Sequence, residues 1–332
     1  MSELRQNIVY KEWVIIAKER AKRPHDFIDN SPKLESDKIY DENCPFCPGN
    51  EEKFPHIEID RIEKDGKWIL RSVLNRYPAL SSETRFEWIE KDIFRTITGY
   101  GTHEVIIESP IHNTTIALMS YEEIAEIISF YKKREDEISK KPNIEYVIIF
   151  RNHGYKAGAS LVHPHSQILA LPIIPRDVKQ RVEEAFKYYS DHGKCVFCKL
   201  IEEELKAKER IILETDHFIS IVLYAASSPF HSWILPKNHS SRFVYIKDEE
   251  IEDLAKHLKN ILLKLYKGLN NPDYNYIIRS SPISYGKNKY FHWYVTIVPR
   301  LTRSAGFELG SGMFINPSIP EEDAKFLREI NV

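Results

Sequence analysis

The sequence of 332 residues lacks any long apolar stretch, and it lacks a surplus of charge of either sign. No apolar run approaches the ~18 residues that a membrane-spanning helix requires, so we expect no membrane partner. Lys and Arg total 47 and Asp and Glu total 49, which leaves a formal net charge of −2. A general nucleic-acid binder needs a basic surplus, so we expect no nucleic-acid partner. The first residues show no basic segment followed by an apolar one, which favours a cytoplasmic protein.

Cysteine is also scarce, with four residues in the whole chain. In a reducing compartment, four cysteines are not expected to form a disulfide framework. They occur as two Cys-x-x-Cys pairs, at 44–47 and 195–198. A Cys-x-x-Cys turn places two thiolates at a spacing that suits tetrahedral zinc. One pair alone would as readily be two buried thiols, but two pairs in matched contexts favour a metal.

The two cysteine pairs begin matching halves of the chain. Each half continues with an apolar segment that leads through Pro to a His, then a helix, a strand and a second His that opens a final strand. His163 follows His112 by 51 residues, and His292 follows His239 by 53. This ordered repetition predicts an internal duplication. We expect two domains, residues 1–172 and residues 173–332.

Local patterns place the helices and strands of each half. Ser120 and Glu123 form the pattern of a capping box ahead of an apolar stripe with helical spacing. The second helix is expected to have Asp248 as its cap. Apolar segments at 146–150 and 276–279 predict one strand in each half. The residues between the halves, 173–194, are expected to act as a linker.

Each half supplies two cysteines and two histidines, the donor set of a closed structural zinc site. The predicted ligands are Cys44, Cys47, His112 and His163 in the first half, and Cys195, Cys198, His239 and His292 in the second. The expected cofactor is zinc, with two ions per chain. A lone histidine is more often a core or surface residue, so it is position in the repeat that favours these four.

The segment around His165 carries the most chemistry. On a strand, His163, His165 and Gln167 would share one face because side chains alternate. An imidazole can attack phosphorus and form a covalent intermediate. Gln167 cannot exchange a proton at neutral pH, so it suits holding a phosphoryl oxygen without activating water, which favours group transfer over hydrolysis. The second half has Tyr294 where His165 stands, which predicts one active centre per chain. Two buried, hydrogen-bonded histidines remain the alternative.

These segments together resemble the galactose-1-phosphate uridylyltransferase family, within the histidine-triad superfamily. The similar segments are CPFCPGNE (44–51), NRYPAL (75–80), GTHEVIIESPIH (101–112), GASLVHPHSQI (158–168), CVFC (195–198), PKNHSS (236–241) and FHWYVTIVPRL (291–301). The resemblance implies an α+β fold of two histidine-triad-like halves, each an antiparallel sheet with helices, and a homodimer. It implies a ping-pong mechanism in which His165 becomes nucleotidylated and Gln167 steadies that intermediate. The nucleotide- and phosphate-binding residues that it implies are Asn75, Arg76, Asn152, Gly158, Ser160 and Gln167.

The C-terminal segment departs from the family pattern. The residues that the resemblance implies for a sugar loop are Phe307, Glu308 and Gly310. Gly306, Ser311 and Gly312 stand where the galactose enzymes carry Lys, Tyr and Glu, and a glycine cannot bind a sugar through a side chain. The glycines also predict an irregular loop over 303–317. Together with Ser166, which stands where galactose enzymes typically carry Gly, the segment resembles the branch that acts as ADP-glucose phosphorylase.

The predicted function is nucleotidyl transfer from a nucleotide sugar of the UDP-glucose type to a hexose-1-phosphate, through nucleotidyl-His165. The alternative is an ADP-glucose phosphorylase-like adenylyltransferase that uses inorganic phosphate as acceptor. The expected partners are accordingly a nucleotide sugar and a sugar phosphate or phosphate. A hypothesis of another class is a zinc-stapled module that binds nucleotides without catalysis. The sequence leaves the choice between uracil and adenine open.

Overall fold

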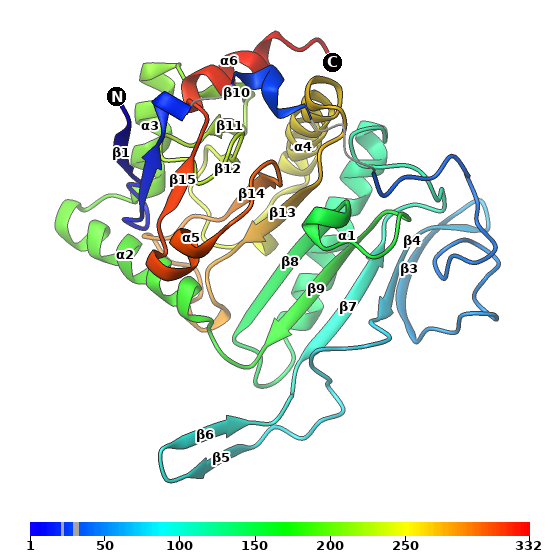
Figure 1. Cartoon of the computed structure of the whole chain (residues 1–332). Helices are drawn as coiled ribbons and strands as arrows, with labels where there is room; N and C mark the ends of the chain where they lie inside the picture. The colour runs from blue at the N-terminus through cyan, green and yellow to red at the C-terminus, as the bar shows by residue number, and fades with distance from the viewer. Residues whose placement is uncertain (21–22, 29–32) are drawn as a thin grey trace.

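A ten-stranded antiparallel sheet runs through the whole molecule (Figure 1). The structure is a computed structural model that describes residues 1–20, 23–28 and 33–332. The strands, in their order across the sheet, are β10 (Ile211–Glu214), β11 (Phe218–Val222), β12 (Ser232–Pro236), β14 (Tyr294–Pro299), β13 (Tyr274–Arg279), β8 (Tyr146–His153), β9 (His165–Leu171), β7 (Thr102–Ile107), β4 (Lys67–Leu74) and β3 (Glu58–Lys64).

The two halves of the sheet have the same strand order when they are read outward from the centre. The centre is the pair β8–β13, with Phe150 opposite Ile277. Outward from it, β8-β9-β7-β4-β3 in the first half matches β13-β14-β12-β11-β10 in the second. Chain order matches as well, since β3, β4, β7, β8 and β9 correspond to β10, β11, β12, β13 and β14. The predicted α+β fold of two related halves with antiparallel sheets is confirmed.

Two long helices occupy equivalent places in the two halves. Helix α1 (Tyr121–Ser139) connects β7 to β8, and α4 (Asp248–Leu269) connects β12 to β13. They pack against each other behind the sheet in the view of Figure 1. The predicted capping box is present, because Ser120 Oγ accepts from the backbone N–H of Glu123 at 3.1 Å. Apolar side chains at helical spacing are buried along α1, which explains why this segment folds as a helix on the sheet.

The start of α4 corrects one prediction. Its N-cap residue is Lys247, and Asp248 is the first residue of the helix. The carboxylate of Glu250 accepts the N–H of Lys247 at 2.9 Å. Glu250, at the third position of the helix, thus satisfies the N–H of the N-cap residue, as the acidic member of a capping box does.

Smaller elements complete the fold. A three-stranded sheet contains β1 (Glu3–Gln6), β2 (Trp13–Ile16) and β15 (Phe314–Asn316). The hairpin of β5 (Trp88–Lys91) and β6 (Phe94–Ile97) projects from the body of the molecule, at the bottom of Figure 1. The other helices are α2 (Arg176–His192), α3 (Val196–Ala207), α5 (Gly306–Ser311) and α6 (Pro320–Glu329).

Two segments are more regular than the sequence predicts. The expected linker 173–194 contains α2, which buries Val178, Val182 and Ala185 at helical spacing. The expected loop 303–317 contains α5 and β15. The carboxylate of Glu308 accepts the backbone N–H of Ala305 at 2.8 Å and so stabilises the start of α5. Strand β15 pairs in parallel with β2, a long-range pairing that the local sequence pattern does not reveal.

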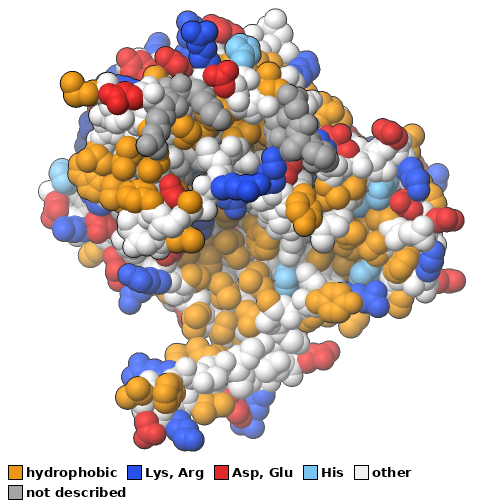
Figure 2. All heavy atoms as spheres, viewed as in Figure 1, with side chains coloured by type: hydrophobic (Ala, Val, Ile, Leu, Met, Phe, Trp, Pro, Cys, Tyr) orange, Lys and Arg blue, Asp and Glu red, His pale blue; other side chains and the backbone are white. Residues whose placement is uncertain are grey.

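The front face of the sheet is covered in one half and open in the other. Over the second half, the ring of Tyr10 lies 5.8 Å from that of Trp233, and Arg181 donates to the hydroxyl of Tyr294 at 3.1 Å. Over the first half, the same face is hollowed, and apolar side chains gather there (Figure 2). Within the described residues, no helix is both long and apolar enough to cross a membrane.

Candidate active site and metal centres

His165 is the first residue of β9, and its side chain projects from the open face of the sheet. Its Nδ1 lies 2.8 Å from the backbone carbonyl of His163. A carbonyl can only accept, so Nδ1 carries the proton and the lone pair lies on Nε2. Burial lowers the pKa of His165 to about 4. The geometry therefore leaves an unprotonated nitrogen at the wall of the hollow.

The hollow is a cavity of about 320 Å³, hereafter the His165 cavity. Its lining residues are Pro45, Phe46, Phe54, His56, Val73, Leu74, Asn75, Arg76, Tyr77, Val105, Ser160, Leu161, His165 and Gln167. Most of these side chains are apolar or aromatic, which suits a nucleoside, and a few polar groups stand beside His165. The structure thus brings five of the predicted site residues to one cavity, namely His165, Gln167, Asn75, Arg76 and Ser160.

A second cavity of about 330 Å³ adjoins the first. The two share His56, Leu74, Asn75 and Arg76 in their walls. His103 lines the second cavity, and its Nε2 lies 2.8 Å from Oε1 of Gln167 in the first. Sequence reasoning assigned no role to His103. Its only signal is its place on the strand of the GTHEV segment, two residues from the strand position that pairs with Gln167.

Two predicted phosphate-binding residues lie beside the cavity. Among the described residues that line it, neither Asn152 nor Gly158 occurs. The side-chain oxygen of Asn152 accepts from the amide of Asn275 at 2.8 Å. Gly158 has φ of +90°, a conformation that glycine tolerates, and a Cβ there would lie 3.6 Å from the amide nitrogen of Asn152. The two residues are therefore neighbours, at the edge of the site.

The predicted sugar loop lies elsewhere in the chain. Phe307, Glu308 and Gly310 are on α5, over the second half of the molecule. None of the three is among the described residues that line the His165 cavity or the adjoining one. Within one chain, the structure does not bring them together with His165.

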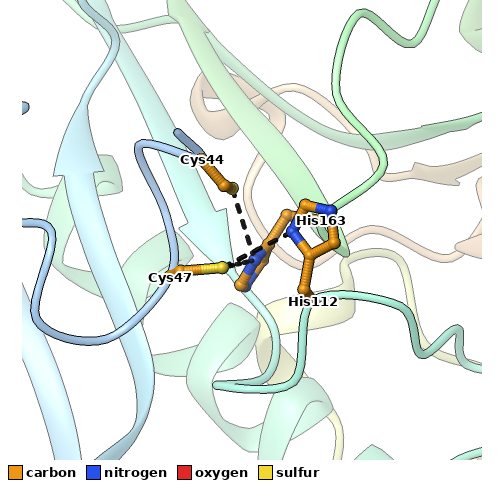
Figure 3. Close-up of side chains that lie close together, drawn as sticks. All are labelled: Cys44, Cys47, His112 and His163. Atoms are coloured by element: carbon orange, nitrogen blue, oxygen red, sulfur yellow. Dashed lines mark hydrogen bonds between the residues drawn. The ribbon is translucent and has the colours of Figure 1, made fainter. Parts of the chain in front are cut away.

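The four predicted ligands of the first half converge (Figure 3). Cys44 and Cys47 come from the loop before β3, His112 follows β7, and His163 precedes β9. Nδ1 of His163 lies 3.6 Å from both sulfurs, and Nδ1 of His112 lies 3.5 Å from Cys47 Sγ. All four ligand atoms lie within 4.8 Å of one another, and all four residues are buried. This arrangement could hold a metal ion.

The protonation of the His163 ring also suits metal binding. Nε2 of His163 lies 2.7 Å from the carbonyl of Ser109, so it carries the proton and Nδ1 keeps the lone pair toward the sulfurs. Burial lowers the pKa of His163 to about 3, so the imidazole is in the neutral form that binds metals. His163 lies two residues before the start of β9, which corrects the expectation that it opens the strand. Pro164, which has no N–H for a ladder, separates the two.

The second half repeats this arrangement. Nδ1 of His239 lies 3.5 Å and Nδ1 of His292 lies 3.8 Å from Cys198 Sγ, and Cys195 completes the group. The outer nitrogens of the two rings lie 2.9 Å from the carbonyl of Asn288 and 2.8 Å from that of Pro236. His292 precedes β14, as His163 precedes β9. This group could also hold a metal, and its His239 is exposed.

Next to the second group, the described part of the chain places no histidine equivalent to His165. Tyr294 is the first residue of β14, where it takes the place of His165, and it is buried against Arg181 and Trp233. Thr296 takes the place of Gln167. The aromatic ring of Tyr10 and the guanidinium of Arg181 stack at 4.5 Å and occupy the space in front of this strand. The second half is thus a filled counterpart of the first.

Comparisons with known proteins agree with this fold. The galactose-1-phosphate uridyl transferase N-terminal domain matches residues 1–175, and the C-terminal domain of the same family matches residues 181–327. The chain therefore belongs to the galactose-1-phosphate uridyl transferase family, whose members are nucleotidyltransferases.

Individual relatives carry two different names. The chain is 42% identical to ADP-glucose phosphorylase of Arabidopsis thaliana, over 99% of this chain and 93% of that protein. It is 31% identical to galactose-1-phosphate uridylyltransferase of Thermotoga maritima, over 100% of this chain and 99% of that protein. A crystal structure of an ADP-glucose phosphorylase from Arabidopsis thaliana with bound ADP-glucose superposes with a TM-score of 0.84 at 39% identity, covering 100% of this chain and 99% of the other.

Proposed function

We propose that this protein transfers a nucleoside monophosphate from a nucleotide sugar to a phosphate oxygen, through a covalent nucleotidyl-His165 intermediate. The observation that carries the proposal is the hydrogen bond from His165 Nδ1 to the carbonyl of His163, at 2.8 Å. It leaves Nε2 as the nucleophilic atom, and His165 and Gln167 both line the cavity.

The chemistry divides into two balanced steps. In the first, Nε2 of His165 attacks the α-phosphorus, an N–P bond forms, and the P–O bond to the sugar phosphate breaks. The sugar phosphate leaves with the electron pair, and the cationic imidazole keeps its Nδ1 proton on the carbonyl of His163. In the second, an oxygen of the acceptor phosphate attacks the same phosphorus. The N–P bond then breaks, and its electron pair returns to Nε2.

For the substrates, we propose ADP-glucose as donor and inorganic phosphate as acceptor, which yields glucose-1-phosphate and ADP. The 42% identity to a plant ADP-glucose phosphorylase supports this pair. The loop residues Gly306, Ser311 and Gly312 support it too, since they offer a sugar few side-chain hydrogen bonds. A specific acceptor sugar would need such partners.

The second candidate is uridylyl transfer from UDP-glucose to a hexose-1-phosphate. Its support is the 31% identity to a bacterial galactose-1-phosphate uridylyltransferase over the full chain. Both candidates share the His165 chemistry, because each acceptor presents a phosphate oxygen. They differ in the base held by the cavity and in the group attached to the acceptor.

We also propose zinc as the metal of both Cys2His2 groups. A set of two cysteine sulfurs and two imidazole nitrogens is typical of closed structural zinc sites, which stabilise a fold and bind no substrate. In the first half, Cys44 and Cys47 would be tied to His163, two residues from the nucleophile. The domains that the two sites would stabilise are residues 1–172 and 173–332.

A homodimer would account for the position of the predicted sugar loop. Helix α5 lies away from the His165 cavity of its own chain, and Phe307 and Leu309 on it are exposed. A partner subunit could bring these side chains to the cavity without any change in the fold. We therefore propose a dimer in which α5 of one subunit serves the cavity of the other.

Product analysis tests the proposed substrates. The purified protein is incubated with ADP-glucose or UDP-glucose, and each donor is offered phosphate, glucose-1-phosphate or galactose-1-phosphate. We expect ADP and glucose-1-phosphate from ADP-glucose with phosphate. Exclusive turnover of UDP-glucose with galactose-1-phosphate would favour the second candidate. No turnover and no covalent adduct with any pair would favour a nucleotide-binding module instead.

A further inference from the structure

His103 holds the side chain of Gln167 from the neighbouring strand. The two residues lie on the same face of β7 and β9, and His103 Nε2 is 2.8 Å from Gln167 Oε1. The other ring nitrogen, Nδ1, accepts the backbone N–H of Ala79 at 3.2 Å. Both nitrogens of the ring are therefore engaged, one by the loop of residues 75–80 and one by Gln167.

These two contacts determine the tautomer of His103. A backbone N–H can only donate, so Nδ1 must carry the lone pair, and the proton of the neutral ring lies on Nε2. Nε2–H then donates to the oxygen of Gln167. The amide nitrogen of Asn75 lies 3.2 Å from the same Nε2, and between two donors this contact is no hydrogen bond. The amide protons of Asn75 are thus left for another acceptor.

From this arrangement, and resting on the function proposed above, we propose that His103 is a positioning residue that fixes the orientation of the Gln167 amide. With its oxygen held by His103, Gln167 turns its NH2 group toward the cavity and His165. That end donates to the negatively charged oxygens of a phosphoryl group. The reversed amide would instead present its oxygen lone pairs to those oxygens and repel them.

The second half of the chain contains the same contact without the chemistry. His231 corresponds to His103 in the matched strand order, and its Nε2 lies 2.8 Å from Oγ1 of Thr296, the counterpart of Gln167. Its Nδ1 is likewise engaged, at 2.9 Å from the hydroxyl of Ser227. Each half therefore has a histidine that contacts the side chain at this position of the neighbouring strand. The first half differs in having a glutamine there, whose far end reaches a cavity beside a nucleophile.

Two substitutions distinguish the effect of the His103 hydrogen-bond donor from the effect of the bulk of its ring. His103→Phe keeps a planar ring and removes the donor, whereas His103→Gln can still present an amide N–H near the position of Nε2. A lost hydrogen bond to a charged group corresponds to roughly a 10- to 100-fold effect. We expect His103→Phe to lower kcat by about that factor with little change in KM, and His103→Gln to restore part of it. Nucleotidyl-His165 should also form more slowly in His103→Phe.

A double-mutant cycle with Gln167→Ala decides whether His103 acts through Gln167. If it does, adding His103→Phe to Gln167→Ala changes kcat by less than about twofold, because the partner is already missing. If His103→Phe costs the double variant as much as it costs the wild type, the positioning role is wrong. A wild type that forms no adduct would overturn the proposed function itself, so the two failures are distinguishable.

His231→Phe is the matched control, because it removes the ring donor in the second half as His103→Phe does in the first. It alters the same contact in the half that has no nucleophile, so we expect a lower melting temperature with kcat and KM close to those of the wild type. If that variant does not fold, Thr296→Val removes the same hydrogen bond with almost no change in shape. A large fall in kcat in a folded control would mean that such contacts act only through general stability, which would overturn the inference.

Discussion

The backbone carbonyl of His163 accepts a hydrogen bond from Nδ1 of His165 at 2.8 Å. The side chain of His163 belongs to the first Cys2His2 group, so one residue contacts that group through its ring and His165 through its backbone. A movement of the Cys44–Cys47 loop would therefore shift His163, and with it the carbonyl oxygen that orients the ring of His165. If the group binds a metal, as proposed, metal binding and the alignment of His165 are joined within three residues of chain.

Removal of the nucleophile gives the first prediction. His165→Gly should abolish overall transfer, with a loss of more than about 10³-fold, because the variant lacks the nitrogen that would bond to phosphorus. Free imidazole added to this variant can occupy the vacated space and restore a half-reaction. The release of sugar phosphate with and without imidazole is the measurement. Full activity of the variant would contradict the assignment.

Loss of metal ligands gives the second prediction. Cys44→Ser and Cys195→Ser should each lower the zinc content by one ion per chain. Each should also cost about 2–3 kcal/mol of stability, or roughly 3–4 °C in melting temperature for a chain of this length. Because only the first site adjoins His165, Cys44→Ser should also slow adduct formation, whereas Cys195→Ser should slow it much less. Elemental analysis, melting curves and adduct rates test this, and metal-free folded wild type would contradict it.

The acceptor gives the third prediction. With Gly306 and Gly312 in the loop, we expect glucose-1-phosphate and galactose-1-phosphate to differ by less than about tenfold in kcat/KM. Inorganic phosphate should be turned over as well, because the intermediate requires only a phosphate oxygen. Steady-state kinetics with each acceptor is the measurement. A strong preference for galactose-1-phosphate with no turnover of phosphate would show that other residues build the sugar site.

Subunit exchange gives the fourth prediction. If α5 of one subunit serves the cavity of its partner, a variant with Phe307→Ala and Glu308→Ala loses activity but keeps His165. Mixed with inactive His165→Gly after dissociation, it should regain up to about a quarter of the wild-type activity, because one cavity of each mixed dimer is complete. A monomer in solution, or no recovery in a verified mixed dimer, would contradict the arrangement. His165→Gly mixed with itself is the control.

The metal groups and the halves of the fold were predictable because their signals repeat along the chain. Cys44 and Cys195 stand in matched contexts, and each repeat orders its histidines in the same way. The capping box at Ser120 involves residues close together in the chain, so the sequence alone was enough to predict it. Helix α5 and strand β15 could not be read, because β15 depends on pairing with β2 some 300 residues earlier. His103 carries no motif, and its role emerges only when β7 and β9 are placed side by side.

The residues that cover Tyr294 could not be predicted from the sequence either. Tyr10 comes from the segment after β1 and Arg181 from α2, and neither lies near Tyr294 in the chain. The sequence indicates that the second half lacks a nucleophile. Only the packing shows that its face is filled, which leaves the hollow beside His165 as the place for a substrate.

The intact mass of the wild-type protein tests the central claim most directly. After incubation with ADP-glucose and no acceptor, the account predicts a mass increase equal to one adenylyl group, located at His165 by peptide mapping. Addition of inorganic phosphate should then remove the group and release ADP in equal amount. Turnover of ADP-glucose, or of UDP-glucose under the same conditions, without any adduct on His165 would contradict the account.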